Sequence, residues 1–236
     1  MGRTHVHTKP EPAFVLNRRP YRETSLLVEA FTEGFGRIGL VAKGARRGKM
    51  PLAAVLQPFH PLLLLWRGSG ELFTLTLAEP DGVSFLPRDP RIKSGFYVNE
   101  LLLRLFHRHD PHPDLFADYR QVLTQITIPG QEESALRVFE KRLLAAIGYG
   151  ISPDLDAGTG LPVEAEKNYY YQPDRGFVEQ NGRSFSGISV RGSTLMAFAK
   201  ETLQEPEQLR ETKALMRVIL RRYLGERPLA SRMLYR

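Results

Sequence analysis

Cysteine is absent from this sequence of 236 residues. The absence excludes disulfide bonds, zinc sites built from thiolates, and catalytic sites that use a cysteine nucleophile. It also fits a reducing compartment, in which disulfides rarely persist. The fold must rely on packing, hydrogen bonds and ion pairs rather than on covalent cross-links.

Long hydrophobic segments are also absent. The longest apolar run, residues 62–66, falls far short of the roughly 18 residues that a membrane-spanning helix needs. Residues 1–12 contain no apolar core of the kind found in secretory signals. Val6 stands where a myristoylation motif requires serine or threonine. We therefore expect no membrane association and a location in the cytoplasm.

Signatures of the common catalytic sites are missing as well. There is no Walker phosphate loop, no Gly-x-Ser-x-Gly elbow and no dinucleotide-binding glycine pattern. The densest group of potential metal ligands is His107, His109, Asp110, His112 and Asp114. Prolines interrupt this group, and no second ligand set with a recognisable spacing lies elsewhere. We therefore expect neither a metal nor another cofactor.

A set of aspartates leaves one enzymatic alternative open. Asp110, Asp114 and Asp118 repeat at intervals of four residues, a pattern that suits the carboxylates of a metal-dependent nuclease. Acidic residues near the start of a helix also interact favourably with its dipole, which explains the same pattern structurally. Incubation of labelled DNA with Mg²⁺ or Mn²⁺ separates the two interpretations, because only a nuclease creates new ends.

Positive charge is in excess. Lysine and arginine number 33 against 26 aspartates and glutamates, which gives a formal net charge of +7. An excess of this sign favours an anionic partner such as nucleic acid, although it carries no information about the fold.

The first third of the chain reads as short strands separated by turns. The apolar or alternating segments are residues 13–16, 26–31, 37–42, 59–66 and 71–78. The last two form the clearest hairpin, because the Arg-Gly-Ser-Gly sequence at 67–70 is rich in residues that accept positive φ. Strands of this number and length predict a small closed barrel, since closure removes exposed strand edges.

Beyond Pro87 and Pro90 the hydrophobic period becomes helical. Helices are predicted over residues 96–107, 115–126 and 136–147, then near Thr194 and over 207–224. Residues 151–187 interrupt this pattern and contain a predicted hairpin around the Pro-Asp-Arg-Gly turn at 173–176. The sequence shows no internal repeat.

Residues 37–49 are the strongest candidate for nucleic-acid binding, because this segment contains basic residues and no acid. With the preceding strand, it gives the predicted DNA contacts Arg18, Arg19, Arg22, Arg37, Lys43, Arg46, Arg47 and Lys49. A cationic loop beside a barrel face can follow a phosphate backbone without a fixed sequence. Tyr21, Phe35 and Phe59 are nearby aromatics for base stacking. A solvated loop with buried aromatics explains the composition equally well.

A second basic stripe lies on the last predicted helix. It consists of Arg210, Lys213, Arg217 and Arg221. Their spacing places them on one face, where like charges repel, and this favours a further DNA-binding surface. Partial neutralisation by Glu207 and Glu211 is the structural alternative.

A third group lies on the predicted helix that starts near Glu133. Its members are Leu136, Arg137, Phe139 and Lys141. Cations at the rim of a groove with an apolar floor suit an acidic peptide that ends in a hydrophobic residue. An ordinary amphipathic helix with a favourable Glu133–Arg137 pair explains the same residues.

Several segments, in their order and spacing, resemble the RecO family of DNA repair proteins. The resemblance is carried by AFVLNRRPYRETSLLVEAFTEGFGRIGLVAKGARR, LQPFHPLLLLWRGSGELFTLTLAE, YVNELLLRLF, ALRVFEKRLLAAIGYG and YLGERPLASRMLYR. The succession of VAKGARR and LQPF is particularly specific.

The resemblance implies an α+β multidomain architecture. Its parts are an OB-fold barrel over residues 1–82, a helical domain over 88–150, a zinc-finger-like hairpin insertion over 151–190, and C-terminal helices over 191–236 that pack on the helical domain. Many RecO proteins carry four cysteines in the insertion. Their absence here indicates the subgroup without zinc, in which the tyrosine-rich hairpin must hold the segment by packing.

The resemblance further implies a recombination mediator that is not an enzyme. RecO proteins bind single- and double-stranded DNA, anneal complementary strands coated with SSB, act with RecR to load RecA, and bind the acidic C-terminal tail of SSB. Arg137 matches the family residue associated with that tail, and Lys43, Arg46 and Arg47 match the basic loop of the OB domain. We expect a nucleoid-associated location. A nuclease, or an adaptor that binds only acidic peptides, is the alternative.

Overall fold

The computed structural model describes residues 5–6, 9–47, 52–85, 91–181 and 187–231. The chain divides into two compact units, one of residues 1–127 and 229–236 and the other of residues 128–228. We name them the barrel unit and the hairpin unit. Both contain helices and strands, so the predicted α+β class is confirmed.

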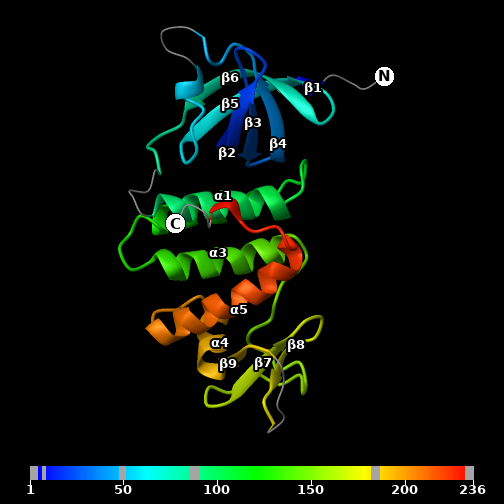
Figure 1. The fold of residues 1–236 in the computed structure, drawn as a ribbon, viewed down its shortest axis with the longest axis vertical. Helices are drawn as coiled ribbons and strands as arrows, with labels where there is room; N and C mark the ends of the chain where they lie inside the picture. Colours follow the sequence, from blue (N-terminus) through cyan, green and yellow to red (C-terminus); the bar gives the residue numbers. More distant parts are fainter. Residues whose placement is uncertain (1–4, 7–8, 48–51, 86–90, 182–186, 232–236) are drawn as a thin grey trace. The chain divides into compact units, whose positions relative to one another are not determined.

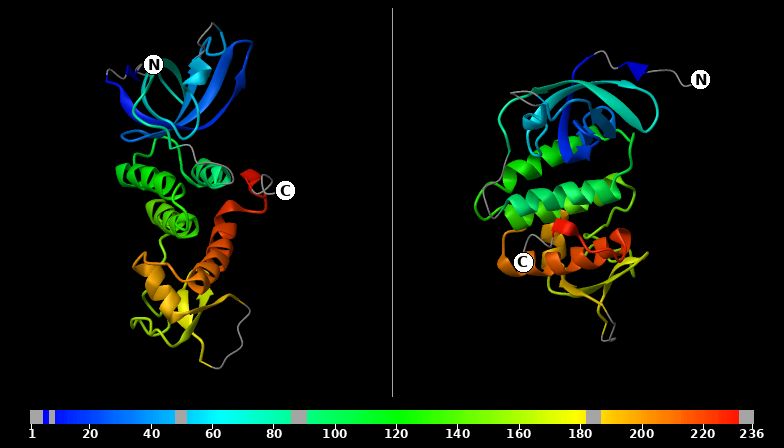
Figure 2. Two further views of the ribbon diagram at one scale, coloured as in Figure 1. Left: turned by 90° about the vertical axis from the view of Figure 1, so that its left-hand side faces the viewer. Right: turned by 45° about the horizontal axis from the view of Figure 1, so that its top comes forward.

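The barrel unit contains a closed five-stranded barrel (Figures 1 and 2). Its strands are β2 (Glu11–Tyr21), β3 (Ser25–Thr32), β4 (Gly36–Ala42), β5 (Pro61–Gly68) and β6 (Leu72–Pro80). They pair in the order β2-β3-β4-β6-β5, and β5 closes the barrel on β2. The β4–β6 pair is parallel and the other pairs are antiparallel. This order confirms the predicted barrel and agrees with an OB fold.

Two shorter elements accompany the barrel. The strand β1 (His5–Val6) pairs with the end of β5, and the 3-10 helix η1 (Leu52–Ala54) precedes β5. The strand β2 is longer than the predicted segment 13–16, so Arg18 and Arg19 lie within the strand rather than in a turn.

Alternation along the strands fills the barrel interior. Val28, Leu40 and Leu64 are fully buried, and inward side chains of all five strands continue the same cluster. Burial of each such side chain contributes about 1.5–3 kcal/mol. In the predicted β5–β6 hairpin, which is confirmed, Gly70 has a φ of 80° that glycine adopts without strain.

Two helices, α1 (Ile92–Leu105) and α2 (Pro113–Gln125), pack against the outside of the barrel. The rings of Phe31 and Phe116 lie 5.3 Å apart. The Asn99 side chain donates a hydrogen bond to the Leu16 carbonyl at 2.9 Å and accepts one from the Tyr119 hydroxyl at 2.7 Å. Burial raises the pKa of Tyr119, against the opposite effect of its bond to Asn99, so the hydroxyl stays a donor. A polar network therefore joins β2, α1 and α2.

The segment after residue 228 returns to the barrel unit. The backbone N–H groups of Ala230 and Ser231 donate to the two carboxylate oxygens of Glu100, each at 2.8 Å. Leu229 is buried beside them. The described end of the chain is thereby anchored to α1.

The hairpin unit combines three helices with a three-stranded sheet. Its elements are α3 (Glu132–Ala146), β7 (Asn168–Gln172), β8 (Gly176–Glu179), β9 (Ser189–Arg191), α4 (Gly192–Ala199) and α5 (Pro206–Leu224). The strand β7 pairs with both β8 and β9, which confirms the predicted hairpin and adds a strand that was not predicted. A capping box of Glu205 and Gln208 starts α5.

The compact units group the predicted segments differently. Residues 88–150 were predicted as one helical domain, but α1 and α2 belong to the barrel unit and α3 to the hairpin unit. Contacts with the barrel strands place α1 and α2 in the barrel unit, and packing against α5 places α3 in the hairpin unit. Among the described residues, no helix has the length and apolar character that a membrane crossing requires.

Candidate nucleic-acid interface

Two turns bring basic residues together at one end of the barrel. The β2–β3 turn follows Tyr21, which pairs with Ser25. The strand β4 ends at Ala42, whose partner is Leu26. Because these pairs are adjacent, the β2–β3 turn and the loop after β4 lie at the same end of the barrel.

Arg46 joins the two turns. Its backbone N–H donates to the Thr24 carbonyl at 2.9 Å. Its guanidinium donates to the Arg22 carbonyl at 2.8 Å and also to the Glu23 carbonyl. The basic loop is therefore held against the β2–β3 turn by hydrogen bonds, which fixes where its neighbouring cations project.

We name the resulting surface the cationic end of the barrel. It consists of Arg19, Arg22, Lys43, Arg46 and Arg47, all of which are exposed. Arg22 lies over the Tyr21 ring at 5.2 Å. Within the described ranges, no acidic side chain pairs with any of the five, so their charges face solvent. The predicted contact Lys49 lies outside the described residues.

The structure gives Arg18 an internal role instead. Its guanidinium donates to Gln57 Oε1 at 2.8 Å and to the Ala53 carbonyl. These bonds hold the segment that contains η1 against β2, so Arg18 acts as a cross-link between elements and we leave it out of the cationic end.

Arg37 is likewise engaged within the barrel unit. Its guanidinium donates to the Leu102 carbonyl at 3.3 Å and to the Leu103 carbonyl, and its Nε lies 3.9 Å from Glu29. Burial lowers the pKa of Arg37, although Glu29 partly offsets this effect. The sequence suggested a DNA contact because it does not reveal that the carbonyl groups at the end of α1 lie over this strand.

Part of the outer face of β3 and β4 is covered by the connection between α1 and α2. Arg108 pairs with Glu29, and its bond to Glu29 is the main reason that its pKa is raised. A Cβ atom at Gly36 would lie 2.0 Å from the Asp110 carbonyl oxygen, so only glycine permits this approach.

In OB folds this face and the adjoining loops bind oligonucleotides. Here the uncovered part adjoins the cationic end. No role for Arg108 was predicted from the sequence.

The three aromatic residues suggested for base stacking have different surroundings. Phe59 is fully buried, so its ring is not open to a base. Tyr21 is half-buried under Arg22. Phe35 is exposed and contacts Trp66 edge-on at 5.4 Å, at the opposite end of the barrel. Of the three, only Tyr21 adjoins the cationic end.

The basic stripe on α5 is partly neutralised, but only one of the two acids suggested for this role takes part: Glu207 pairs with the stripe, whereas Glu211 contacts Arg191 and Thr194. Arg210 pairs with Glu207 at 3.3 Å, and Lys213 pairs with Glu133 at 2.6 Å. Arg217 and Arg221 are exposed, and the described residues supply no ion-pair partner for them. The stripe thus offers two cations to a ligand rather than four.

The predicted peptide site on α3 is closed. Leu136, Arg137 and Phe139 are each at most 5% exposed. The Arg137 guanidinium pairs with Glu140 at 2.9 Å rather than with Glu133, so the predicted Glu133–Arg137 pair is wrong. In this arrangement a peptide would have to move neighbouring side chains to reach Arg137.

Lys141 belongs to a separate cluster of contacts. Its ammonium donates to the carbonyls of Phe198 and Ala199 at 3.1 and 3.0 Å and pairs with Glu201 at 2.9 Å. Arg142 contacts the same carboxylate at 3.2 Å. Glu201 therefore already pairs with Lys141 and Arg142, the cations that an acidic peptide would contact.

The histidine and aspartate cluster does not assemble a metal site. His112 lies 3.3 Å from Asp110, while His109 faces the Phe73 ring. Among the described residues, no three histidine, aspartate or glutamate side chains come close enough to share a metal ion. The geometry offers no support for the nuclease alternative.

Known proteins are similar in sequence to both units. The family model described as Recombination protein O N terminal matches residues 7–82, and Recombination protein O C terminal matches residues 91–233. The DNA repair protein RecO of Nitrosococcus oceani is 46% identical over 222 residues, which cover 94% of this chain and 90% of the relative. That of Alkalilimnicola ehrlichii is 47% identical over 232 residues, covering 96% and 90%. That of Actinobacillus pleuropneumoniae serotype 7 is 45% identical over 223 residues, covering 94% and 92%.

Proposed function

The chain belongs to the RecO family of DNA repair proteins, and on this basis we propose that it is a recombination mediator that binds single- and double-stranded DNA without cleaving it. The cationic end of the barrel holds the phosphate backbone. The chain anneals complementary strands coated with SSB and acts with RecR to promote loading of RecA. It works in the cytoplasm, at the nucleoid.

The observation that carries this proposal is the cationic end itself. Five exposed cations, four on two turns and Arg19 at the adjoining end of β2, form a surface that Arg46 holds in place. Each phosphate that such a surface neutralises releases counterions, which favours binding without regard to base sequence. A mediator that acts on any damaged sequence needs binding of this kind.

The test is to remove cations that have no role inside the fold. We expect Arg19→Ala/Lys43→Ala/Arg47→Ala to weaken binding to a single-stranded oligonucleotide on the order of 10- to 100-fold near 0.15 M salt, because three phosphate contacts are lost. Fluorescence anisotropy measures the affinity. Arg46 is kept, because its bonds to the β2–β3 turn are structural.

A matched control removes the same charge elsewhere. Lys9→Ala/Arg120→Ala/Lys200→Ala takes away three exposed cations outside the cationic end. The control is expected to lose much less affinity than the test variant. Equal losses in the two variants would show that net charge, and not the cationic end, governs binding.

Binding of the SSB tail by Leu136, Arg137, Phe139 and Lys141 is a further part of the proposal, supported by the family resemblance. The closed geometry adds a requirement. Because Glu201 holds Lys141 and Arg142, the acidic tail must displace it. Glu201→Gln should therefore tighten binding of a tail peptide in a titration, and unchanged affinity would count against this site.

A further inference from the structure

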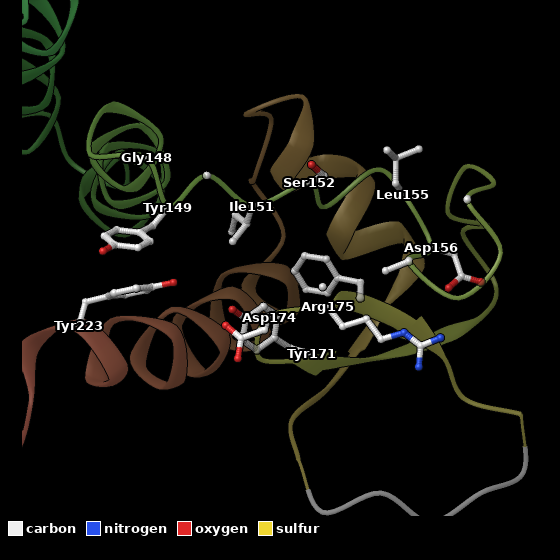
Figure 3. A pocket seen from close by; sticks show the side chains of 15 residues that line it. Gly148, Tyr149, Ile151, Ser152, Leu155, Asp156, Tyr171, Asp174, Arg175 and Tyr223 are labelled. Carbon is white, nitrogen blue, oxygen red and sulfur yellow. The ribbon is translucent and has the colours of Figure 1, made fainter.

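A pocket of about 440 Å³ lies within the hairpin unit (Figure 3). Its walls are the segment after α3, the turn between β7 and β8, and the end of α5. Four aromatic side chains line it: Tyr149, Tyr171, Phe177 and Tyr223. No role was predicted for this pocket, because its walls come from three segments that are distant in the sequence.

Two of the tyrosines form a stacked pair at one end of the pocket. The rings of Tyr149 and Tyr223 have centroids 4.4 Å apart and planes inclined by 33°. Tyr149 is nevertheless 52% exposed. Its backbone N–H donates to the Leu144 carbonyl at 2.8 Å, which fixes the residue at the end of α3. The pair is thus a supported aromatic platform with a face left open.

The wall opposite the platform is held in place by its own hydrogen bonds. The Asp156 carboxylate accepts from the Gly158 N–H at 2.8 Å and from the Thr159 hydroxyl at 3.0 Å. The Gly160 N–H donates to the Asp156 carbonyl at 2.7 Å. The pocket is therefore formed before a ligand arrives, and the Asp156 carboxylate is already used inside the wall.

The remaining charges leave a cation at the pocket. Asp174 is neutralised by Arg222, whose guanidinium contacts both carboxylate oxygens at 2.6 and 2.7 Å. Arg175 is exposed, and its side chain has no partner among the residues that the structure describes. In Figure 3 the Arg175 side chain extends toward the end of the pocket away from the tyrosine pair. The pocket thus presents an aromatic platform at one end and an unneutralised guanidinium at the other.

We propose that this pocket binds single-stranded DNA, with one base stacked on Tyr149 and a backbone phosphate of the same strand at Arg175. The proposal rests on the proposed DNA-binding function and adds a contact outside the barrel unit. Proteins that bind single strands combine aromatic platforms with cations along the backbone, and every base has a face that can stack. A base within a duplex is already stacked and paired, so the pocket favours single strands over double strands.

The test uses the full chain and a short single-stranded oligothymidine. Tyr149→Ala is expected to weaken binding about 5- to 150-fold, the range found when a base loses an aromatic stacking partner. Tyr149→Phe, which retains the ring, should bind as the unaltered chain does. The matched control is Leu161→Ala, because Leu161 is an exposed apolar residue of the same unit that does not line the pocket.

Salt dependence separates the two contacts. Tyr149→Ala should leave the slope of log affinity against log salt unchanged, because stacking releases no counterions. Arg175→Ala should make that slope shallower by about 0.7, the value for one phosphate on a single strand. Binding to duplex DNA should change little in Tyr149→Ala. Equal losses for single strands and duplex would overturn the proposal.

Photocrosslinking locates the base directly. An oligonucleotide with 5-iodouracil is irradiated with the full chain, and the modified residues are identified by mass spectrometry. Adducts on Tyr149 or Tyr223 support the proposal. Adducts confined to the barrel unit overturn it while the proposed function stands, whereas the absence of any DNA binding removes both. If Tyr149→Ala loses affinity for an acidic peptide and retains it for DNA, the pocket is a peptide site and the proposal fails.

Discussion

Arg137 shows how much the surroundings of a single residue determine what it can do. The side chain is 5% exposed, and its partner Glu140 is fully buried. Charges in such positions are costly unless they are paired, so each side chain depends on the other. A substitution at Arg137 therefore acts first on stability and only afterwards on any ligand.

We predict that Arg137→Met lowers the free energy of unfolding by about 3–5 kcal/mol, because it removes the guanidinium that pairs with a buried carboxylate. Urea denaturation measures the change. The double variant Arg137→Met/Glu140→Leu should recover most of the loss, since it removes both members of the buried ion pair. A single variant that loses less than about 1 kcal/mol would mean that the pair behaves as an exposed one.

The basic residues also show what the sequence can and cannot predict at this scale. The exposure of Lys43, Arg46 and Arg47 was expected from a glycine-containing loop without acids. Arg18 and Arg37 occur in the same basic regions, but carbonyl groups distant in the sequence accept their hydrogen bonds. Composition identifies a cation, whereas its role depends on acceptors that only the folded chain brings near.

Contacts between elements give the hairpin unit a pH-dependent link. Glu201 follows α4 and contacts Lys141 and Arg142 on α3. Burial raises the pKa of Glu201, but its bonds to Arg142 and Lys141 outweigh this effect, so the pKa lies below its ordinary value of 4.5. The folded state thus favours the ionised carboxylate, and this stabilises the fold only while the carboxylate is charged.

The sign of the pH dependence follows from that lowered pKa. The stabilisation is complete above the ordinary pKa of 4.5 and is lost as the pH falls through the lower folded value. We predict that Glu201→Gln is less stable than the unaltered chain near neutral pH and that the difference shrinks progressively below about pH 4.5. Urea denaturation across this range measures it.

The control for this prediction is Glu226→Gln, which alters an exposed carboxylate with no ion pair in the described part of the chain. Its stability should match that of the unaltered chain both near neutral pH and below about pH 4.5. A stability difference for Glu201→Gln that stays constant as the solution is acidified would contradict the assigned link.

At the scale of elements, local signals predicted more than pairing did. The β5–β6 and β7–β8 hairpins follow from their turn residues, and five helices of the described chain follow from apolar spacing. The parallel β4–β6 pair that completes the barrel has no local signal, because its two strands are separated by β5. The packing of α1 and α2 on the barrel was not predicted either, because it joins segments that are distant in the sequence.

The whole molecule combines a net charge of +7 with two compact units that each carry a candidate contact for DNA. The cationic end of the barrel supplies charge with little aromatic surface. The pocket of the hairpin unit supplies aromatic surface with one free guanidinium. Contacts in both units would raise the affinity for a strand long enough to reach them, because the second contact then forms within one complex.

The family resemblance was carried by sequence blocks from both units, and the matches over residues 7–82 and 91–233 confirm it. The candidate site was less accessible to sequence analysis. The cationic end was predicted in outline, since its residues are neighbours in the chain. The pocket was not predicted, since Tyr149, Arg175 and Tyr223 meet only after folding.

The central claim is that the cationic end neutralises phosphates, and the salt dependence of single-strand binding tests it most directly. If three to five phosphates are neutralised, log affinity should fall with log salt at a slope of roughly −2 to −3.5. In the variant Arg19→Ala/Lys43→Ala/Arg47→Ala, the slope should be shallower by about 2. A slope near zero in the unaltered chain, or the same slope in both proteins, would contradict the claim.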